Sequence, residues 1–255
     1  MPSPFDLTGR TALVTGASSG LGARFARMLA AQGVNVVAGA RRLDRLQSLA
    51  DAVRGDGGRI EPVEMDVEDE ASIIAAYDHA EATFGTVDLI LANAGINAQG
   101  PATDLPSDEL GQLLRINVQG VYLTAREGAR RLIASPDPSR GRIILLGSVG
   151  SLRPLAGLTA YSASKAGVAM LGKGLAREWA RHGINVNTIC PGWIVTELNA
   201  EWLAGEGGQK LIRSFPRRRV MNPEDLDGLV TFLASEASRT ITGGVFAADD
   251  GQVLA

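Results

Sequence analysis

The chain has 255 residues and a mass of 26.7 kDa, enough for one large domain with a substantial core. Its hydrophobic fraction of 45% and charged fraction of 21% are typical of globular proteins, and its net charge of -3 gives no electrostatic reason to expect nucleic acid or an acidic membrane as partner. The single cysteine, Cys190, excludes an internal disulfide, and the start MPSPFDLTGR has no signal-peptide pattern, so we expect a cytoplasmic protein.

Short apolar runs alternate with helical patterns along the chain. Strands are expected at residues 11–15, 34–39, 59–65, 87–93, 142–148, 185–190 and 244–251. Apolar helical stripes begin near residues 21, 43 and 73, and longer helices are expected at about 107–134 and at 161–183. Pro62 is unfavourable within the third strand because proline donates no hydrogen bond. The alternation predicts one doubly wound α/β (Rossmann) domain, with a mostly parallel seven-stranded sheet and helices on both faces.

A glycine-rich segment, TGASSGLG, follows the first strand and opens the first helix. Glycines there let backbone N–H groups approach a pyrophosphate, and the helix N-terminus adds partial positive charge. Glycines also form tight turns that bind nothing, but the strand–turn–helix context is the one that a dinucleotide site requires. We therefore expect dinucleotide contacts from Gly16, Ser18, Ser19, Gly20, Leu21 and Gly22.

The spacing T-G-x-x-x-G-x-G, together with ANAG at 92–95 and YSASK at 161–165, resembles the short-chain dehydrogenase/reductase family. The further family landmarks occur in the expected order, so the resemblance covers residues 8–252; they are DV at 66–67, RINVQG, ILLGSVGS, NTICPGWIVT and DDGQ. Two positions depart from the family pattern. Ala92 stands where Asn is common, and Gln252 stands where Gly is common. The resemblance implies a member similar to 3-oxoacyl reductases and other ketoreductases.

The family's catalytic residues match Asn117, Ser148, Tyr161 and Lys165. Tyr161 and Lys165 lie one helical turn apart and share a face, which in most helices marks only an amphipathic pair. A free phenol has a pKa of about 10, and we expect the ammonium to lower it so that Tyr161 serves as general acid/base. By resemblance, Ser148 orients the substrate oxygen, Lys165 also binds the nicotinamide ribose, and Asn117 holds a water that relays protons to Lys165.

The residues at the end of the second strand indicate which nicotinamide cofactor is bound. An NAD site carries an acidic residue about 20 positions beyond the glycines, but this chain has Ala40 there, followed by Arg41 and Arg42. Guanidinium groups suit a 2′-phosphate, so we predict NADP(H) over NAD(H). Ser19 stands where many NADP enzymes of the family carry Lys or Arg, and both arginines also suit a solvated helix start. NAD(H) is therefore the alternative.

The resemblance also implies the rest of the pocket. Asp66 and Val67 are expected at the adenine, Asn93, Ala94 and Gly95 at its ribose, and Pro191, Gly192, Ile194 and Thr196 at the nicotinamide. Ser148, Tyr161, Arg153 and Leu155 are expected at the substrate. Apolar side chains in 150–159 favour a ketone or acyl group larger than a sugar, whereas Arg153 suits either an anionic group or solvent. Residues 197–219, which contain several glycines, are expected to form a substrate lid.

These features predict an oxidoreductase that transfers a hydride between NADP(H) and a ketone, 3-oxoacyl group or secondary alcohol. The alternatives are an NAD(H)-linked alcohol or hydroxysteroid-type dehydrogenase, and a non-catalytic dinucleotide-binding regulator, which the intact Ser148, Tyr161 and Lys165 disfavour. No cluster has metal-ligand spacing, so no metal is expected. The helix from 161 is apolar nearly all round and needs burial on more than its sheet face. The resemblance implies that it pairs across the interface of a homodimer, usually within a homotetramer. A monomer with Lys173, Arg177 and Arg181 in water is the alternative.

Overall fold

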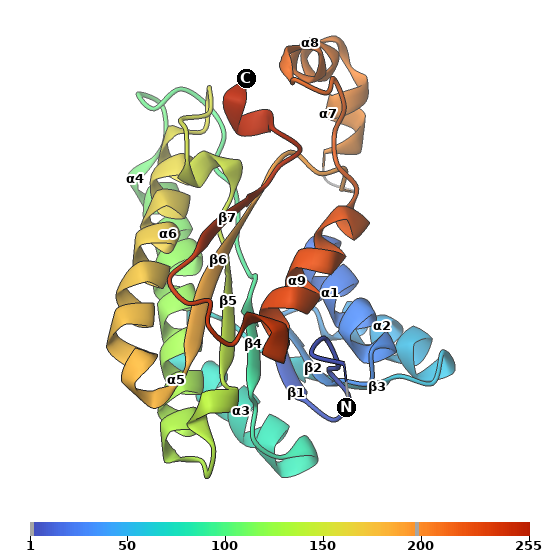
Figure 1. The fold of residues 1–255 in the computed structure, drawn as a ribbon. Helices are drawn as coiled ribbons and strands as arrows, with labels where there is room; N and C mark the ends of the chain where they lie inside the picture. The colour runs from blue at the N-terminus through green and yellow to red at the C-terminus, as the bar shows by residue number, and fades with distance from the viewer. Residues whose placement is uncertain (1–2, 197–198) are drawn as a thin grey trace.

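A seven-stranded parallel sheet forms the centre of the computed structural model, which describes residues 3–196 and 199–255 (Figure 1). The strands are β1 Thr11–Thr15, β2 Asn35–Ala40, β3 Arg59–Glu64, β4 Leu89–Ala92, β5 Arg142–Leu146, β6 Asn185–Pro191 and β7 Val245–Ala248. Their order across the sheet is β3-β2-β1-β4-β5-β6-β7, and every neighbouring pair is parallel. The strand order therefore reverses between β1 and β4, the place where a doubly wound sheet opens a crevice.

Helices connect successive strands. The α-helices are α1 Gly20–Ala31, α2 Leu43–Gly55, α3 Glu70–Phe84, α4 Ser107–Leu114, α5 Val121–Ala134, α6 Thr159–Trp179, α7 Ala200–Ala204, α8 Glu206–Ser214 and α9 Asp227–Ala234. A π-helix, η1 Arg115–Gly120, joins α4 to α5. Short 3₁₀ turns are η2 Pro138–Arg140, η3 Val149–Ser151, η4 Ala180–His182, η5 Pro223–Leu226, η6 Glu236–Ser238 and η7 Gln252–Leu254.

The two faces of the sheet are covered by different helices, because successive strand residues point to opposite sides. In β1, Val14 belongs to the core cluster that contains Phe25 of α1 and Val230 of α9, whereas Leu13 belongs to the cluster with Ile73 of α3. Figure 1 shows α1, α2 and α9 on one side and α3, α5 and α6 on the other. The predicted doubly wound sheet with helices on both faces is confirmed.

Several expected boundaries differ from the structure, for local reasons. Pro62 pairs with Ala38 in β3, and it is tolerated because β3 lies at the edge of the sheet and needs hydrogen bonds on one side only. The expected helix at 107–134 is continuous in extent but contains the π-helix η1. The expected helix at 161–183 begins two residues earlier, in α6, and its last turn is the 3₁₀ turn η4.

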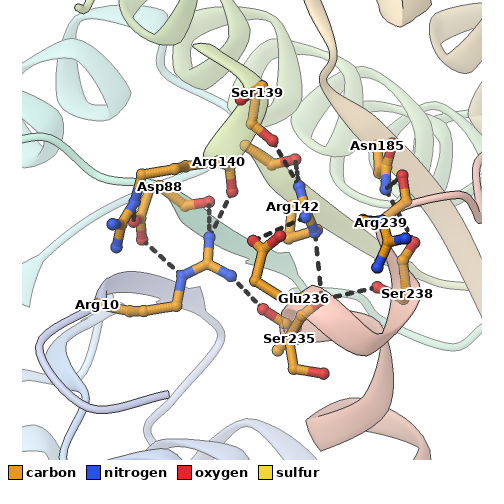
Figure 2. Close-up of polar contacts among 12 residues, drawn as sticks. Arg10, Asp88, Ser139, Arg140, Arg142, Asn185, Ser235, Glu236, Ser238 and Arg239 are labelled. Atoms are coloured by element: carbon orange, nitrogen blue, oxygen red, sulfur yellow. Dashed lines mark hydrogen bonds and ion pairs between the residues drawn. The ribbon is translucent and has the colours of Figure 1, made fainter. Parts of the chain in front are cut away.

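Buried charged side chains lie where the strands begin, at what we call the amino-terminal edge of the sheet (Figure 2). Asp88 accepts hydrogen bonds from Arg10 Nε at 3.2 Å and from Arg140 Nε at 3.0 Å. Arg142, which is 2% exposed, pairs with Glu236 at 3.0 Å. These contacts tie the loops before β1, β4 and β5 to one another and join β5 to the η6 turn after α9.

Candidate active site

Two adjoining cavities open at the carboxyl-terminal edge of the sheet. The larger has a volume of about 620 Å³, and the smaller, over the glycine-rich turn, has a volume of about 400 Å³. Both are lined by Leu21, Asn93, Gly95 and Ile96, so they form one continuous groove at the β1/β4 reversal. Ligands of doubly wound folds bind at this position.

Three of the four predicted catalytic side chains line the larger cavity: Ser148, Tyr161 and Lys165. Tyr161 and Lys165 come from the start of α6, and Ser148 follows β5. Lys165 Nζ lies 5.9 Å from the centre of the Tyr161 ring and donates a 2.8 Å hydrogen bond to the carbonyl oxygen of Leu146. The Ser148 side chain lies close enough to the Tyr161 phenol to affect its ionisation. The structure therefore brings a phenol, a hydroxyl and an amine to one cavity wall.

Burial dominates the ionisation of this pair. It raises the pKa of Tyr161 above its usual value, although the neighbouring Ser148 hydroxyl lowers it in part. Burial also lowers the pKa of Lys165 to about 8. The expectation that Lys165 lowers the pKa of Tyr161 is not met here. The ammonium is directed to the Leu146 carbonyl, and the cost of placing a phenolate in an apolar site is the larger effect.

Asn117 lies in the π-helix η1 and is fully buried. Its Oδ1 accepts from the Ile96 N–H at 2.8 Å, and its Nδ2 donates to the Ile96 carbonyl at 2.9 Å. A Cβ added at Gly95 would lie 3.2 Å from Asn117 Oδ1 and 3.3 Å from Lys165 Nζ, so both side chains flank the same glycine. The extra residue in the π turn directs the amide inward beside Lys165.

Two serines that the sequence analysis did not single out hold these groups in place. Ser164 Oγ donates to the Tyr161 carbonyl at 2.7 Å and accepts from Asn117 Nδ2 at 3.0 Å. Ser151 Oγ donates to the Lys165 carbonyl at 2.7 Å and accepts from the Ser148 N–H at 3.1 Å. The available sequence signal was the Ser148–Ser151 spacing, which is that of a capping box.

The glycine-rich turn fits a pyrophosphate. Gly16 and Gly20 have φ of +68° and +54°, a backbone conformation that favours glycine. A Cβ at Gly22 would lie 2.4 Å from the Gly16 carbonyl oxygen, so the helix packs on the turn only without a side chain there. Ser19, the N-cap of α1, makes no side-chain hydrogen bond to the helix, which leaves its first N–H groups for an anion.

The smaller cavity continues to the residues expected at the adenosine. Its lining includes Gly16, Ser18, Ser19, Leu21, Arg41, Arg42, Asp66, Val67, Asn93, Ala94 and Gly95. Gly20 and Gly22 belong to the same turn but are not among the lining residues. Arg42 donates to Ser18 Oγ and to Ser19 Oγ, each at 2.9 Å, so a guanidinium lies over the glycine-rich turn. Thr15, not singled out from the sequence, accepts at its Oγ1 from the Asn93 and Ala94 N–H groups at 3.0 Å and fixes the β4 end.

The residues expected at the nicotinamide, Pro191, Gly192, Ile194 and Thr196, line the larger cavity. Asn199 fixes this segment, because its Oδ1 accepts from the Thr196 N–H at 2.8 Å and its Nδ2 donates to the Ile194 carbonyl at 2.9 Å.

On the substrate side, Leu155 lines the larger cavity but Arg153 does not. The η3 turn brings the Arg153 N–H to the Val149 carbonyl at 3.1 Å, and the apolar residues of the loop make the wall instead. The substrate contact expected of Arg153 therefore has no support in the structure. Of the expected lid, Glu197 and Leu198 lie outside the described residues, and the part from Asn199 onward contains α7 and α8.

Among residues 3–196 and 199–255, no group of three or more His, Cys, Asp or Glu side chains is placed to hold a metal ion. No helix within the described part of the chain combines the length and apolar character needed to cross a membrane.

Known proteins resemble this chain over nearly its whole length. The family model for short chain dehydrogenase matches residues 10–207. The oxidoreductase UcpA of Salmonella typhimurium is 36% identical, over 97% of this chain and 96% of that protein. The 3beta-hydroxysteroid dehydrogenase 1 of Eggerthella lenta is 37% identical, over 98% of this chain and 95% of that protein.

Among solved structures, a gluconate 5-dehydrogenase from Burkholderia cenocepacia in complex with NADP and tartrate superposes with a TM-score of 0.93. It is 35% identical, and the match covers 99% of this chain and 98% of that one. The chain belongs to the short chain dehydrogenase family and is an NAD(P)-dependent oxidoreductase acting on alcohol or ketone substrates.

Proposed function

We propose that this chain interconverts a carbonyl group and a secondary alcohol with NADP(H), using Tyr161 as general acid/base. The observation that carries the proposal is the position of the Tyr161 phenol. It lies beside Ser148 and one helical turn from Lys165, in a cavity that continues to the glycine-rich turn. The nicotinamide ring, when bound, supplies or accepts the hydride.

The chain's own residues position and move the proton. Ser148 Oγ accepts from the Gly150 N–H at 3.0 Å, so its own proton is free to donate to Tyr161 or to a substrate oxygen. In reduction, Tyr161 gives its phenolic proton to the developing alkoxide, and in oxidation it takes that proton back. Lys165 uses one hydrogen on the Leu146 carbonyl, which leaves two for ribose hydroxyls. Asn117, beside Lys165, is the site for a relaying water.

NADP(H) is favoured over NAD(H) by charge. No carboxylate stands at Ala40, and Arg41 and Arg42 both line the smaller cavity. The Burkholderia gluconate 5-dehydrogenase, which binds NADP, has the same fold at 35% identity. NAD(H) is retained as the second candidate because Ser19 supplies a hydroxyl rather than a cation at the turn.

We further propose that residues 1–255 form one Rossmann-fold domain in which 197–219 act as a substrate lid, and that the chain assembles as a homodimer or homotetramer. Support for assembly comes from apolar side chains left exposed on α4, α5 and α6, which are Leu114, Ile133 and Met170.

The chemistry is tested with the variant Tyr161→Phe, which removes one hydroxyl. We expect turnover to fall by about 10²–10⁴-fold, because a positioned acid/base contributes this much. Turnover is followed at the nicotinamide absorbance with both cofactors and a panel of ketones, acyl thioesters and secondary alcohols. Cofactor binding, measured by titration, should stay unchanged.

The matched control is Tyr122→Phe on α5, whose ring is 38% exposed and lies away from the cavities. It should keep full turnover. Wild-type turnover rates in Tyr161→Phe would remove Tyr161 from the mechanism.

A further inference from the structure

The wall of the larger cavity that continues from Tyr161 is apolar. Val149, Leu155 and Leu158 are buried and form a small cluster, against which Tyr161 and Trp193 pack. All five residues also line the cavity. The reacting groups therefore adjoin an aliphatic and aromatic surface.

Trp193 is held by its backbone. Its N–H donates to Gln252 Oε1 at 2.6 Å, and its carbonyl oxygen accepts from the Met221 N–H at 3.0 Å and from Gln252 Nε2 at 3.4 Å. Gln252 is 1% exposed, and a Cβ at Gly192 would lie 2.6 Å from its Oε1. Gln252 is the position at which the sequence departs from the family's common glycine. A glycine has no amide group with which to hold Trp193.

The ring of Trp193 connects this fixed segment to α7. It stacks on Trp202, with ring centroids 5.5 Å apart and planes inclined by 23°. A Cβ at Gly207 of α8 would lie 3.9 Å from the indole of Trp202, which is ordinary contact, so the ring lies between Trp193 and the backbone of α8. In Figure 1, α7 and α8 lie at the same end of the molecule as the C-terminus. The pair joins this α7–α8 segment to the cavity wall.

The cavity offers few charged partners to a polar substrate. Of the described residues that line it, Lys165 alone carries a formal charge, and the hydrogens that Leu146 leaves on its Nζ are the ones assigned above to the ribose. Asn199 uses both ends of its amide on the backbone of Ile194 and Thr196, whereas the side chains of Asn97 and Thr196 add polar groups to the lining. A carboxylate placed there would lose hydration without gaining a second cation, and a row of hydroxyls would also face the apolar wall.

We infer that the substrate carries a bulky apolar ring system beside its carbonyl or carbinol carbon, and that Trp202 determines this specificity by fixing the ring of Trp193. Gln252 is the positioning residue for Trp193. This inference rests on the proposed function, since it concerns the substrate of that same reaction. An apolar ring packs on the indole and on Leu155 and Leu158, and its burial supplies binding free energy that a polyol does not.

The test compares three ketones with NADPH: 1-tetralone, which is bicyclic and apolar; D-fructose, a polyhydroxylated ketone of similar size, whose concentration is counted as the open-chain ketone because most of the sugar is cyclic in water; and acetone, which is too small to reach the wall. The wild type should favour 1-tetralone over D-fructose in kcat/KM by about 100-fold or more. Trp202→Ala should lower kcat/KM for 1-tetralone about tenfold, mainly through KM, because loss of a packed wall weakens binding. Acetone should change by less than about twofold.

Conservative and control variants show whether the loss of 1-tetralone activity in Trp202→Ala comes from the cavity wall or from damage to the fold. Trp202→Phe keeps an aromatic ring and should recover most of the 1-tetralone activity, and Gln252→Gly should reproduce the loss seen in Trp202→Ala. Leu254→Ala, at a side chain that is 81% exposed beside Gln252, should behave as the wild type. The chain has three tryptophans, and the stacked pair should give a near-ultraviolet exciton signal that Trp202→Ala abolishes. Thermal unfolding and NADPH affinity should stay near wild type.

The outcomes of this test distinguish a failure of the inferred substrate class from a failure of the proposed function. A wild type that reduces D-fructose better than 1-tetralone, or a Trp202→Ala variant that affects all three ketones equally, overturns the substrate class and leaves the proposed function standing. A wild type that reduces no ketone, and no member of the wider panel, overturns both.

Discussion

At the residue scale, Tyr161 and Lys165 share one buried environment, which shifts their pKa values in opposite directions. Burial raises the pKa of the phenol and lowers that of the amine to about 8, so both shifts favour the neutral form. Lys165 is charged below about pH 8 and loses that charge as the pH rises through this value. The sequence could place the two side chains on one helix face, but the direction of the Tyr161 shift depends on burial, which spacing alone does not reveal.

Cofactor preference is also decided by single residues. Arg42 lies over Ser18 and Ser19, where its guanidinium can meet a 2′-phosphate. We predict that Ala40→Asp combined with Arg42→Ala reverses the preference. A charge-assisted hydrogen bond contributes about 1.5–3 kcal/mol, so the affinity for NADPH should fall about tenfold or more while NADH binding improves. Dissociation constants for both dinucleotides measure the effect.

The control is Arg181→Ala. Arg181 is exposed, contacts His182 through its Nε and lines neither cavity. The substitution should leave both affinities unchanged. Tighter binding of NADH than of NADPH by the wild type would show that the NADP(H) assignment is wrong.

At the scale of elements, the turn between β1 and α1 depends on close packing. We predict that Gly22→Ala lowers the free energy of unfolding by about 1–3 kcal/mol, as overpacking does, and weakens dinucleotide binding. Its Cβ would lie 2.4 Å from the Gly16 carbonyl and 2.6 Å from Asn93 Nδ2, and the Asn93 amide is already bonded to the Thr15 carbonyl. Chemical denaturation and cofactor titration measure the two effects.

Gly228 in α9 provides the comparison, since a Cβ there meets nothing within 4 Å. Gly228→Ala should raise stability by about 0.5–1 kcal/mol, because alanine loses less backbone entropy in a helix. Equal effects of the two substitutions would contradict the packing explanation.

Most elements could be predicted from periodicity, whereas their irregularities could not. Buried strands such as β1 and β5 are continuous apolar runs, and the order of strands and helices sufficed for the doubly wound sheet. The π-helix η1 was missed because one extra residue per turn scarcely changes an apolar pattern over so short a segment. That irregularity is what places Asn117 beside Lys165.

At the scale of the whole molecule, the two edges of the sheet differ in character. The amino-terminal edge is held by the buried charges of Arg10, Asp88 and Arg142 (Figure 2), and the carboxyl-terminal edge holds both cavities. Contacts that join distant parts of the chain, such as Gln252 with Trp193, could not be predicted, because no local pattern records a partner 59 residues away.

The buried charges at the amino-terminal edge predict that a substitution there changes the free energy of unfolding but not cofactor affinity. Asp88→Ala leaves Arg10, which is 5% exposed, buried without its carboxylate. We expect the free energy of unfolding to fall by about 3–5 kcal/mol, the cost of breaking a buried ion pair. Denaturation measures this effect, and cofactor affinity at a temperature where the variant is folded should match the wild type.

Asp78→Ala is the matched control, because Asp78 pairs with Arg131 at 2.6 Å but its side chain is 64% exposed. Loss of such a surface pair should cost less than about 1 kcal/mol. A loss of similar size in both variants would contradict the role assigned to Asp88.

The separation of the two edges affects how this protein can diversify. The buried ion pairs of Arg10 and Arg142 lie at the opposite ends of the strands from the cavities, so substitutions around Trp193 and Trp202 leave those pairs unchanged. Descendants of this chain could therefore acquire new substrates through a few mutations at the carboxyl-terminal edge, while the ion pairs of the amino-terminal edge keep the fold stable enough to accept them.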